Sequence, residues 1–154
     1  MTIPKQLQNK EFRFVLLKRQ DKVPIEKEWT GRNSYSYDDP TLLEHIKAGG
    51  NYGVATGFGN LLVIDCDDLI AESVVEQNLP ATFTVLTGSG RKHFYYICEN
   101  GKSLKIFMNA KKETLADIQF SGKQVVGASS IHPSGGVYKI FNDADIAKIN
   151  LEDI

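Results

Sequence analysis

Two aspartates that directly follow an apolar run are the residues best suited to chemistry in this sequence. Residues 61–64 are all aliphatic, a Gly/Asn-containing turn signal precedes them at 57–60, and Asp65 and Asp67 come next. An apolar run bounded in this way indicates a buried strand, and alternation along a strand places Asp65 and Asp67 on one face. Neighbouring carboxylates raise each other's pKa unless a cation lies between them, and their hard oxygen atoms suit Mg²⁺ or Mn²⁺. We therefore interpret Asp65 and Asp67 as ligands of a divalent metal ion.

The same run of acids has a simpler interpretation in part. Asp67 or Asp68 could cap the helix that the sequence predicts from Leu69 onward, because an aspartate before a helix accepts hydrogen bonds from its first free N–H groups. A capping role suits Asp68 but leaves Asp65 unexplained. Both interpretations stay open for Asp68, whereas Asp65 and Asp67 remain the predicted metal ligands.

Length and composition predict one globular domain spanning residues 1–154. The hydrophobic fraction of 42% and the charged fraction of 24% are ordinary for such a domain. No apolar run approaches the length of a membrane span, and the polar N-terminus lacks the hydrophobic region of a signal peptide. Cys66 and Cys98 each lie in an apolar run, which favours buried free thiols and a cytoplasmic location. Two cysteines cannot form a four-cysteine zinc site, although histidine could complete a mixed one.

The charge distribution is uneven along the chain. The formal net charge is −1, whereas nucleic-acid-binding proteins usually present a basic surface. Residues 91–123, however, contain seven basic residues and only three acids, Glu99, Glu113 and Asp117. An ordinary solvated face is the default explanation of such a segment, which is also compatible with phosphate binding. The basic residues are Arg91, Lys92, Lys102, Lys105, Lys111, Lys112 and Lys123.

Hydrophobic periodicity predicts a mixture of strands and helices. Residues 57–60 should form a tight hairpin that joins strand 52–55 to the strand carrying Asp65. A second hairpin should join strands 82–86 and 93–97. Further strands are expected at 12–17, 116–120, 125–126 and 137–141, and helices at 42–48, 69–78, 143–149 and within 100–115.

The loop of the second hairpin and the strands beyond it supply further candidate residues. Gly88 and Gly90 allow close approach of backbone N–H groups to a ligand, but the spacing is not that of a Walker A loop. His93 opens the following strand, where a structural role is the usual one. Asp117 should face away from the core that holds Ile118, and it could be either a third metal ligand or a surface acid.

Several blocks of the sequence, taken in order, resemble a known family. They are residues 51–57, 63–67, 88–96, 117–119 and 130–138, preceded by Lys22-Val23-Pro24 and Lys27-Glu28-Trp29. Together they resemble the N-terminal catalytic domain of bifunctional DNA primase/polymerases (prim-pol) of the archaeo-eukaryotic primase superfamily, found in plasmids, phages and mobile elements. The likeness spans roughly residues 12–141. The sequence departs from the family pattern at Arg91, where a small residue is common, and at Ala128-Ser129, where prolines are common.

The resemblance implies an α+β fold: an RRM-like catalytic β-sheet with flanking helices, a second small α/β unit, and an active site in the cleft between them. It implies that Asp65, Asp67 and Asp117 hold divalent metal and that His93 contacts the phosphates of the incoming nucleotide. It also implies a nucleotide pocket with contributions from Ser89, Arg91, Lys92, Ser130 and His132.

The implied activity is template-directed nucleotidyl transfer to a 3′-hydroxyl by a two-metal mechanism with Mg²⁺ or Mn²⁺. Its substrates would be nucleoside triphosphates and a DNA template with primer, and a helicase or replication protein could be a partner. Two alternatives remain open. One is a nucleic-acid- or nucleotide-binding module of the same fold without turnover. The other is a haloacid-dehalogenase-like phosphatase with Asp65 as nucleophile, since that fold also begins with a strand ending in Asp-x-Asp.

Overall fold

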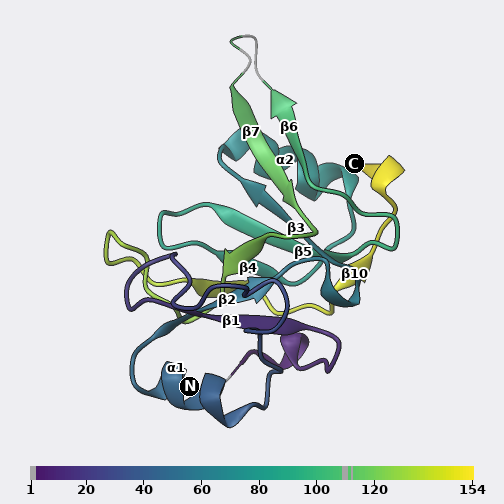
Figure 1. Ribbon diagram of the computed structural model, residues 1–154. Coiled ribbons are helices and arrows are strands. Elements are labelled where there is room, and N and C mark those ends of the chain that lie inside the picture. Colours follow the sequence, from purple (N-terminus) through teal and green to yellow (C-terminus); the bar gives the residue numbers. More distant parts are fainter. Residues whose placement is uncertain (1–2, 109–110, 112) are drawn as a thin grey trace.

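Two β-sheets and two α-helices make up most of the chain in the computed structural model, which describes residues 3–108, 111 and 113–154 (Figure 1). The helices are α1 (Pro40–Lys47) and α2 (Leu69–Asn78). The strands are β1 (Arg13–Leu17), β2 (Asn51–Ala55), β3 (Leu61–Cys66), β4 (Thr84–Leu86), β5 (Lys92–Ile97), β6 (Leu104–Met108), β7 (Thr114–Gln119), β8 (Gln124–Val126), β9 (Lys139–Asn142) and β10 (Ala147–Lys148).

The large sheet has the strand order β6-β7-β3-β5-β4-β9, and β10 pairs with β5 outside this path. Its central order β7-β3-β5-β4 is that of an RRM-like sheet, and each of these neighbouring pairs is antiparallel. In Figure 1 strands β6 and β7 rise beyond the rest of this sheet, and α2 lies behind them. Asp68 caps α2 through a 2.7 Å hydrogen bond from the Ile70 N–H to its carboxylate, which confirms the capping interpretation for Asp68.

The second unit is a three-stranded sheet of order β1-β2-β8, with α1 packed against β1 and β2. In Figure 1 this sheet lies below the large sheet, and α1 lies on its far side. Asp39 caps α1, and Pro40 occupies the first turn, where its missing N–H has no intrahelical partner to lose. Strand β2 is buried along its entire length because it lies between β1 and β8.

Alternation along β3 divides its side chains between two hydrophobic cores. Leu61 and Val63 belong to the core that the large sheet shares with the small unit. Leu62 and Ile64 belong to the core between the large sheet and α2. The large sheet is therefore covered on one face by α2 and on the other by the small unit. This mixed α/β architecture confirms the expected fold class.

Three expectations about local structure are wrong. Residues 57–60 do not form a hairpin, because β2 and β3 belong to different sheets and the segment between them is a 3₁₀ turn that crosses from one to the other. The described part of residues 100–115 holds no helix, since Leu104–Met108 pairs with β7 as a strand. Residues 143–149 are not helical either, because Ala147–Lys148 pairs in parallel with β5.

Among the described residues, no helix is both long enough and apolar enough to cross a membrane.

Candidate active site

A row of charged side chains crosses the large sheet on the face turned toward the small unit. The strand register places Asp65 of β3 directly between Asp117 of β7 and His93 of β5. Lys105 of β6 is in turn paired with Asp117. Directly paired residues of neighbouring strands project from the same face, with their Cβ atoms about 5 Å apart. Segments that are far apart in sequence therefore bring two acids and a histidine together.

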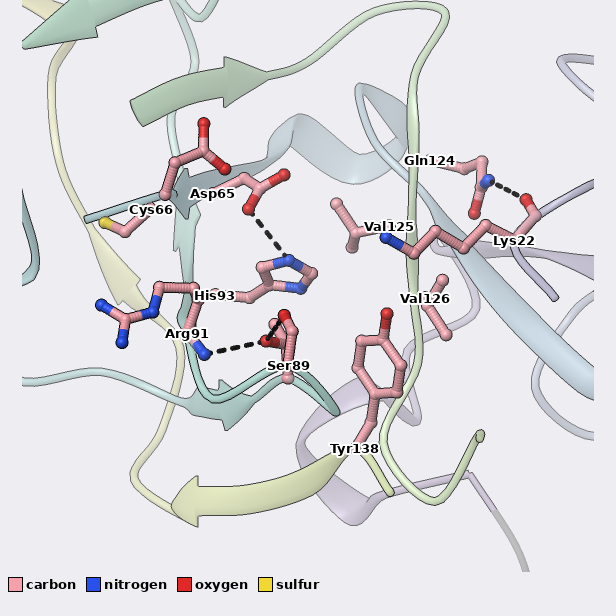
Figure 2. A pocket seen from close by; sticks show the side chains of 12 residues that line it. Lys22, Asp65, Cys66, Ser89, Arg91, His93, Gln124, Val125, Val126 and Tyr138 are labelled. Carbon is pink, nitrogen blue, oxygen red and sulfur yellow. Dashed lines mark hydrogen bonds and ion pairs between the residues drawn. The ribbon is translucent and has the colours of Figure 1, made fainter. Parts of the chain in front are cut away.

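The middle of this row opens into a cavity of about 170 Å³ between the two units (Figure 2). The large sheet contributes Asp65, Cys66 and His93, and the run after β3 contributes Asp67. The cavity lies where the cleft between the catalytic sheet and the small unit was expected. The remaining lining residues are Lys22, Thr87, Ser89, Arg91, Gln124, Val125, Val126 and Tyr138.

Asp65 and His93 form an ion pair or hydrogen bond at the base of the cavity. The Nε2 of His93 lies 3.2 Å from Oδ1 of Asp65, and both side chains are mostly buried (8% and 28% exposed). Burial would raise the pKa of Asp65, but the hydrogen bond and charge of His93, with smaller contributions from Lys22 and Gln119, outweigh it and lower the pKa. The expected upward shift therefore does not occur at Asp65. The Nδ1 of His93 is buried and has no hydrogen-bond partner among the described residues.

Asp67 has the upward pKa shift that neighbouring carboxylates produce. Desolvation is the largest cause of its raised pKa, and the negative charges of Asp65 and Asp117 add to it. The Asp67 N–H donates to the Leu115 carbonyl at 2.8 Å, which continues the pairing of β3 with β7 by one residue. Asp67 is thereby held on the same side as the other two acids, although its own side chain is exposed.

The donor chemistry of these acids fits a divalent cation. Three carboxylates within electrostatic reach of one another offer hard oxygen ligands, and a cation would relieve the repulsion that raises the pKa of Asp67. As the side chains stand, no group of three His, Cys, Asp or Glu residues within the described ranges is arranged to hold a metal ion. One oxygen of Asp65 is directed at His93, so the carboxylates do not converge on one point.

Two of the residues that were expected to bind nucleotide lie in the hairpin loop before β5 and line the cavity. They are Ser89 and Arg91. In Figure 2 the guanidinium of Arg91 turns away from His93. Its Nη1 lies 3.3 Å from the carboxylate of Glu72, a buried acid of α2. The Arg91 backbone is fixed as well, because its N–H donates to the Thr87 hydroxyl at 2.9 Å.

Three other candidate nucleotide-binding residues lie outside the cavity lining. Lys92 projects from the opposite face of β5, where it pairs with Glu76 at 2.6 Å. The Ser130 hydroxyl is buried and accepts a hydrogen bond from the Tyr52 N–H. His132 is hydrogen-bonded through Nδ1 to the Ser134 hydroxyl at 2.7 Å.

The glycine at position 88 is required by loop packing. A Cβ atom there would lie 2.5 Å from the carbonyl oxygen of Gly136 and 2.4 Å from the Cβ of His132, and neither distance is sterically possible. The hairpin loop before β5 and the loop before β9 therefore pack against each other at Gly88 and Gly136. This contact holds Ser89 at the mouth of the cavity without any need for a ligand at Gly88.

The sequence did not indicate several residues that the fold brings to the acids. Lys22, in the loop after β1, reaches across from the small unit and lowers the pKa of Asp65 (Figure 2). Tyr138 also lines the cavity. Its pKa is raised to about 12, mainly by burial and to a smaller extent by the negative charge of Asp65. Gln119 of β7 also helps to lower the pKa of Asp65. The only feature of the sequence that could have indicated Lys22 and Tyr138 is their place within the blocks that resemble the prim-pol family.

An RRM-like sheet, a smaller α/β unit and an acid-lined cleft between them define a primase-type α+β domain. The family model described as bifunctional DNA primase/polymerase, N-terminal, matches residues 5–152, and the chain belongs to this family. Among solved structures it is similar to the archaeo-eukaryotic primase domain of the cyanophage S-2L primase-polymerase. That likeness has 16% sequence identity, covers 90% of this chain and 85% of that chain, and has a TM-score of 0.49. No curated protein matches the sequence.

Proposed function

We propose that this domain catalyses template-directed transfer of nucleotides to a DNA 3′-hydroxyl, as a primase/polymerase of a plasmid, phage or mobile element. Its substrates are nucleoside triphosphates and a DNA template with primer, and residues 1–154 act as one catalytic domain. The observation that carries the proposal is the register of the large sheet, which sets Asp65 between Asp117 and His93 at the cavity. Family membership points to the same class of enzyme.

In this proposal Asp65, Asp67 and Asp117 hold divalent metal, either Mg²⁺ or Mn²⁺. A metal pair held there would supply a lower pKa for the attacking 3′-hydroxyl and neutralisation of charge on the leaving pyrophosphate. The protein contributes carboxylates that project from neighbouring strands of one sheet. Strands hold the backbone more rigidly than loops do, so the change needed for Asp65 and Asp117 to converge on a metal ion is a rotation of their side chains.

His93 has two roles in the proposal. Through Nε2 it fixes the orientation of the Asp65 carboxylate. Through Nδ1, which has no partner among the described residues, it offers a hydrogen-bonding group to the triphosphate when the side chain or the neighbouring loop adjusts. Lys22 adds positive charge to the same cavity, and Ser89 adds a hydroxyl at its mouth. Arg91 adds a second cation when its guanidinium turns from Glu72 toward the phosphates. These groups bind and orient the phosphates, which is most of what phosphoryl transfer requires of a protein.

A primer-extension assay with Mg²⁺ or Mn²⁺ tests the function. Wild-type protein should extend a labelled primer on a template, and Asp65→Ala/Asp67→Ala should abolish extension while leaving the fold intact by circular dichroism. Removal of metal with a chelator should have the same effect as the double substitution. Equal extension by wild type and double variant would refute the proposal. Nucleotide binding by the wild type without any extension would favour the alternative of a binding module without turnover.

A further inference from the structure

A second cavity, of about 320 Å³, adjoins the first on the same face of the large sheet. Asp117, Gln119, Lys105 and Lys123 are among the residues that line it. Asp117 is the direct neighbour of Asp65, which lines the first cavity. Gln119 is paired with Val63 of β3, so it projects from the same face as Asp65 and Asp117 and also lines the second cavity. The paired residues Asp65 and Asp117 therefore line two neighbouring cavities on one face of the sheet.

The second cavity has a basic rim on the side away from His93. Lys105 is paired with Asp117 across β6 and β7, and its side chain is exposed. Lys123 is exposed in the turn before β8, and the hydrogen bond from the Thr56 N–H to the Lys123 carbonyl at 3.0 Å anchors its backbone. From edge to centre, the row across the sheet therefore reads Lys105, Asp117, Asp65 and His93.

The geometry of nucleotidyl transfer indicates on which side of the acids each substrate binds. The attacking oxygen and the leaving pyrophosphate lie roughly in line on opposite sides of the phosphorus atom. In the proposed function the phosphate-binding groups Ser89 and Arg91 lie on the His93 side of the acids, because both belong to the loop that leads into β5. The strand that supplies the 3′-hydroxyl must then approach from the opposite side, and the second cavity lies there.

We propose that the second cavity binds the 3′-terminal end of the nucleic-acid strand being extended, with Lys105 and Lys123 contacting its backbone phosphates. This inference rests on the proposed function and assigns one cavity to each substrate. The nucleoside triphosphate occupies the cavity of His93, and the growing strand occupies the cavity of Lys105. Asp117 and Gln119 stand at the boundary between the two.

The test is the variant Lys105→Glu/Lys123→Glu, measured by fluorescence anisotropy with a primed DNA hairpin at several salt concentrations. We expect at least a tenfold loss of DNA affinity. The slope of log K against log salt should become shallower by about 2, since each lost phosphate contact removes about 0.9. Affinity for the nucleoside triphosphate should stay within about twofold of wild type, because neither lysine lines the first cavity. The milder Lys105→Gln/Lys123→Gln should show a smaller loss of the same kind.

Lys5→Glu/Lys47→Glu is the matched control. It changes the net charge equally, and both lysines are exposed and belong to short helical segments outside the two cavity linings. An equal loss of DNA affinity in the control, or wild-type affinity in Lys105→Glu/Lys123→Glu, would overturn the inference. In the second case, metal-dependent extension by the wild type would leave the proposed function standing. A wild-type protein that neither binds nor extends primed DNA would overturn both.

Discussion

The two faces of the large sheet differ in how far their apolar layers extend, although the same strands supply both. On the face toward α2, Leu62, Ile64 and Cys66 are all completely buried along β3. On the face toward the small unit, the apolar layer ends at Val63, and Asp65 takes the next position. The small sheet covers Leu61 and Val63 but leaves the row at Asp65 open to a cavity.

Within β3, side chains on one face therefore serve mainly stability, whereas Asp65 on the other face serves the proposed chemistry. The α2 face is a closed core, so its side chains contribute mainly to the free energy of unfolding. The open face places charges near one another in a partly buried site, which costs stability unless a ligand compensates. Removing a buried apolar side chain on the α2 face and removing Asp67, the acid with the raised pKa on the open face, should therefore have effects of opposite sign on stability.

The largest effect on stability is expected from Leu62→Ala. Leu62 is completely buried against the α2 core and is three positions from Asp65. Its truncation should lower the free energy of unfolding by about 2–5 kcal/mol, the usual range for a buried leucine. Primer extension below the new melting temperature should persist. Urea denaturation measures the loss, and Leu69→Ala is the control, because Leu69 is 66% exposed and should change stability by less than about 0.5 kcal/mol.

A smaller effect is expected at Asp68, which separates the capping acid from the proposed metal ligands. Asp68→Ala removes the acceptor of the Ile70 N–H at the start of α2. The free energy of unfolding should fall by about 1 kcal/mol. Asp68→Asn keeps a capping oxygen and should restore most of that loss in thermal denaturation. A loss of primer extension with Asp68→Asn would contradict the assignment, because it would place Asp68 among the residues that act on substrate.

The features that sequence could predict are those with a local pattern. Alternation of aliphatic residues and acids in residues 61–67 correctly indicated β3 and the shared side of Asp65 and Asp67. The position of Asp68 immediately before the first helical residue, Leu69, correctly indicated the helix cap. In each case, the residues that decide the structure lie within a few positions of one another.

The features that sequence missed depend on partners far along the chain. The segment Leu104–Met108 carries lysine among its apolar residues and is a strand because β7 offers it a ladder of backbone partners. Lys22 lies in a polar loop, and only the packing of the small unit onto the large sheet brings it to Asp65. Apart from the family resemblance of Lys22-Val23-Pro24, nothing near Lys22 in the sequence distinguishes it from the other basic residues of the chain.

The smallest change in the free energy of unfolding is expected from Asp67→Asn in metal-free buffer, and it should be an increase rather than a decrease. The pKa of Asp67 is raised by partial burial and by the charges of Asp65 and Asp117, so its ionised form is disfavoured in the folded protein. A group with a raised pKa contributes stability at acidic pH and loses it as pH rises through the folded-state value. At pH 7 the neutral amide should therefore raise the free energy of unfolding by about 0.5 kcal/mol, typical of removing a like-charge contact between neighbouring strands.

This gain should disappear below about pH 3, where Asp67 is protonated in both the folded and the unfolded protein. It should also shrink in high salt, because the side chain is exposed and its repulsion is screened. Thermal denaturation at the two pH values measures the difference. Asp145→Asn, at an exposed acid outside both cavity linings, is the control and should change nothing. A destabilised Asp67→Asn at pH 7 without metal would show that the acids of the open face do not repel one another, and the contrast between the two faces would then be wrong.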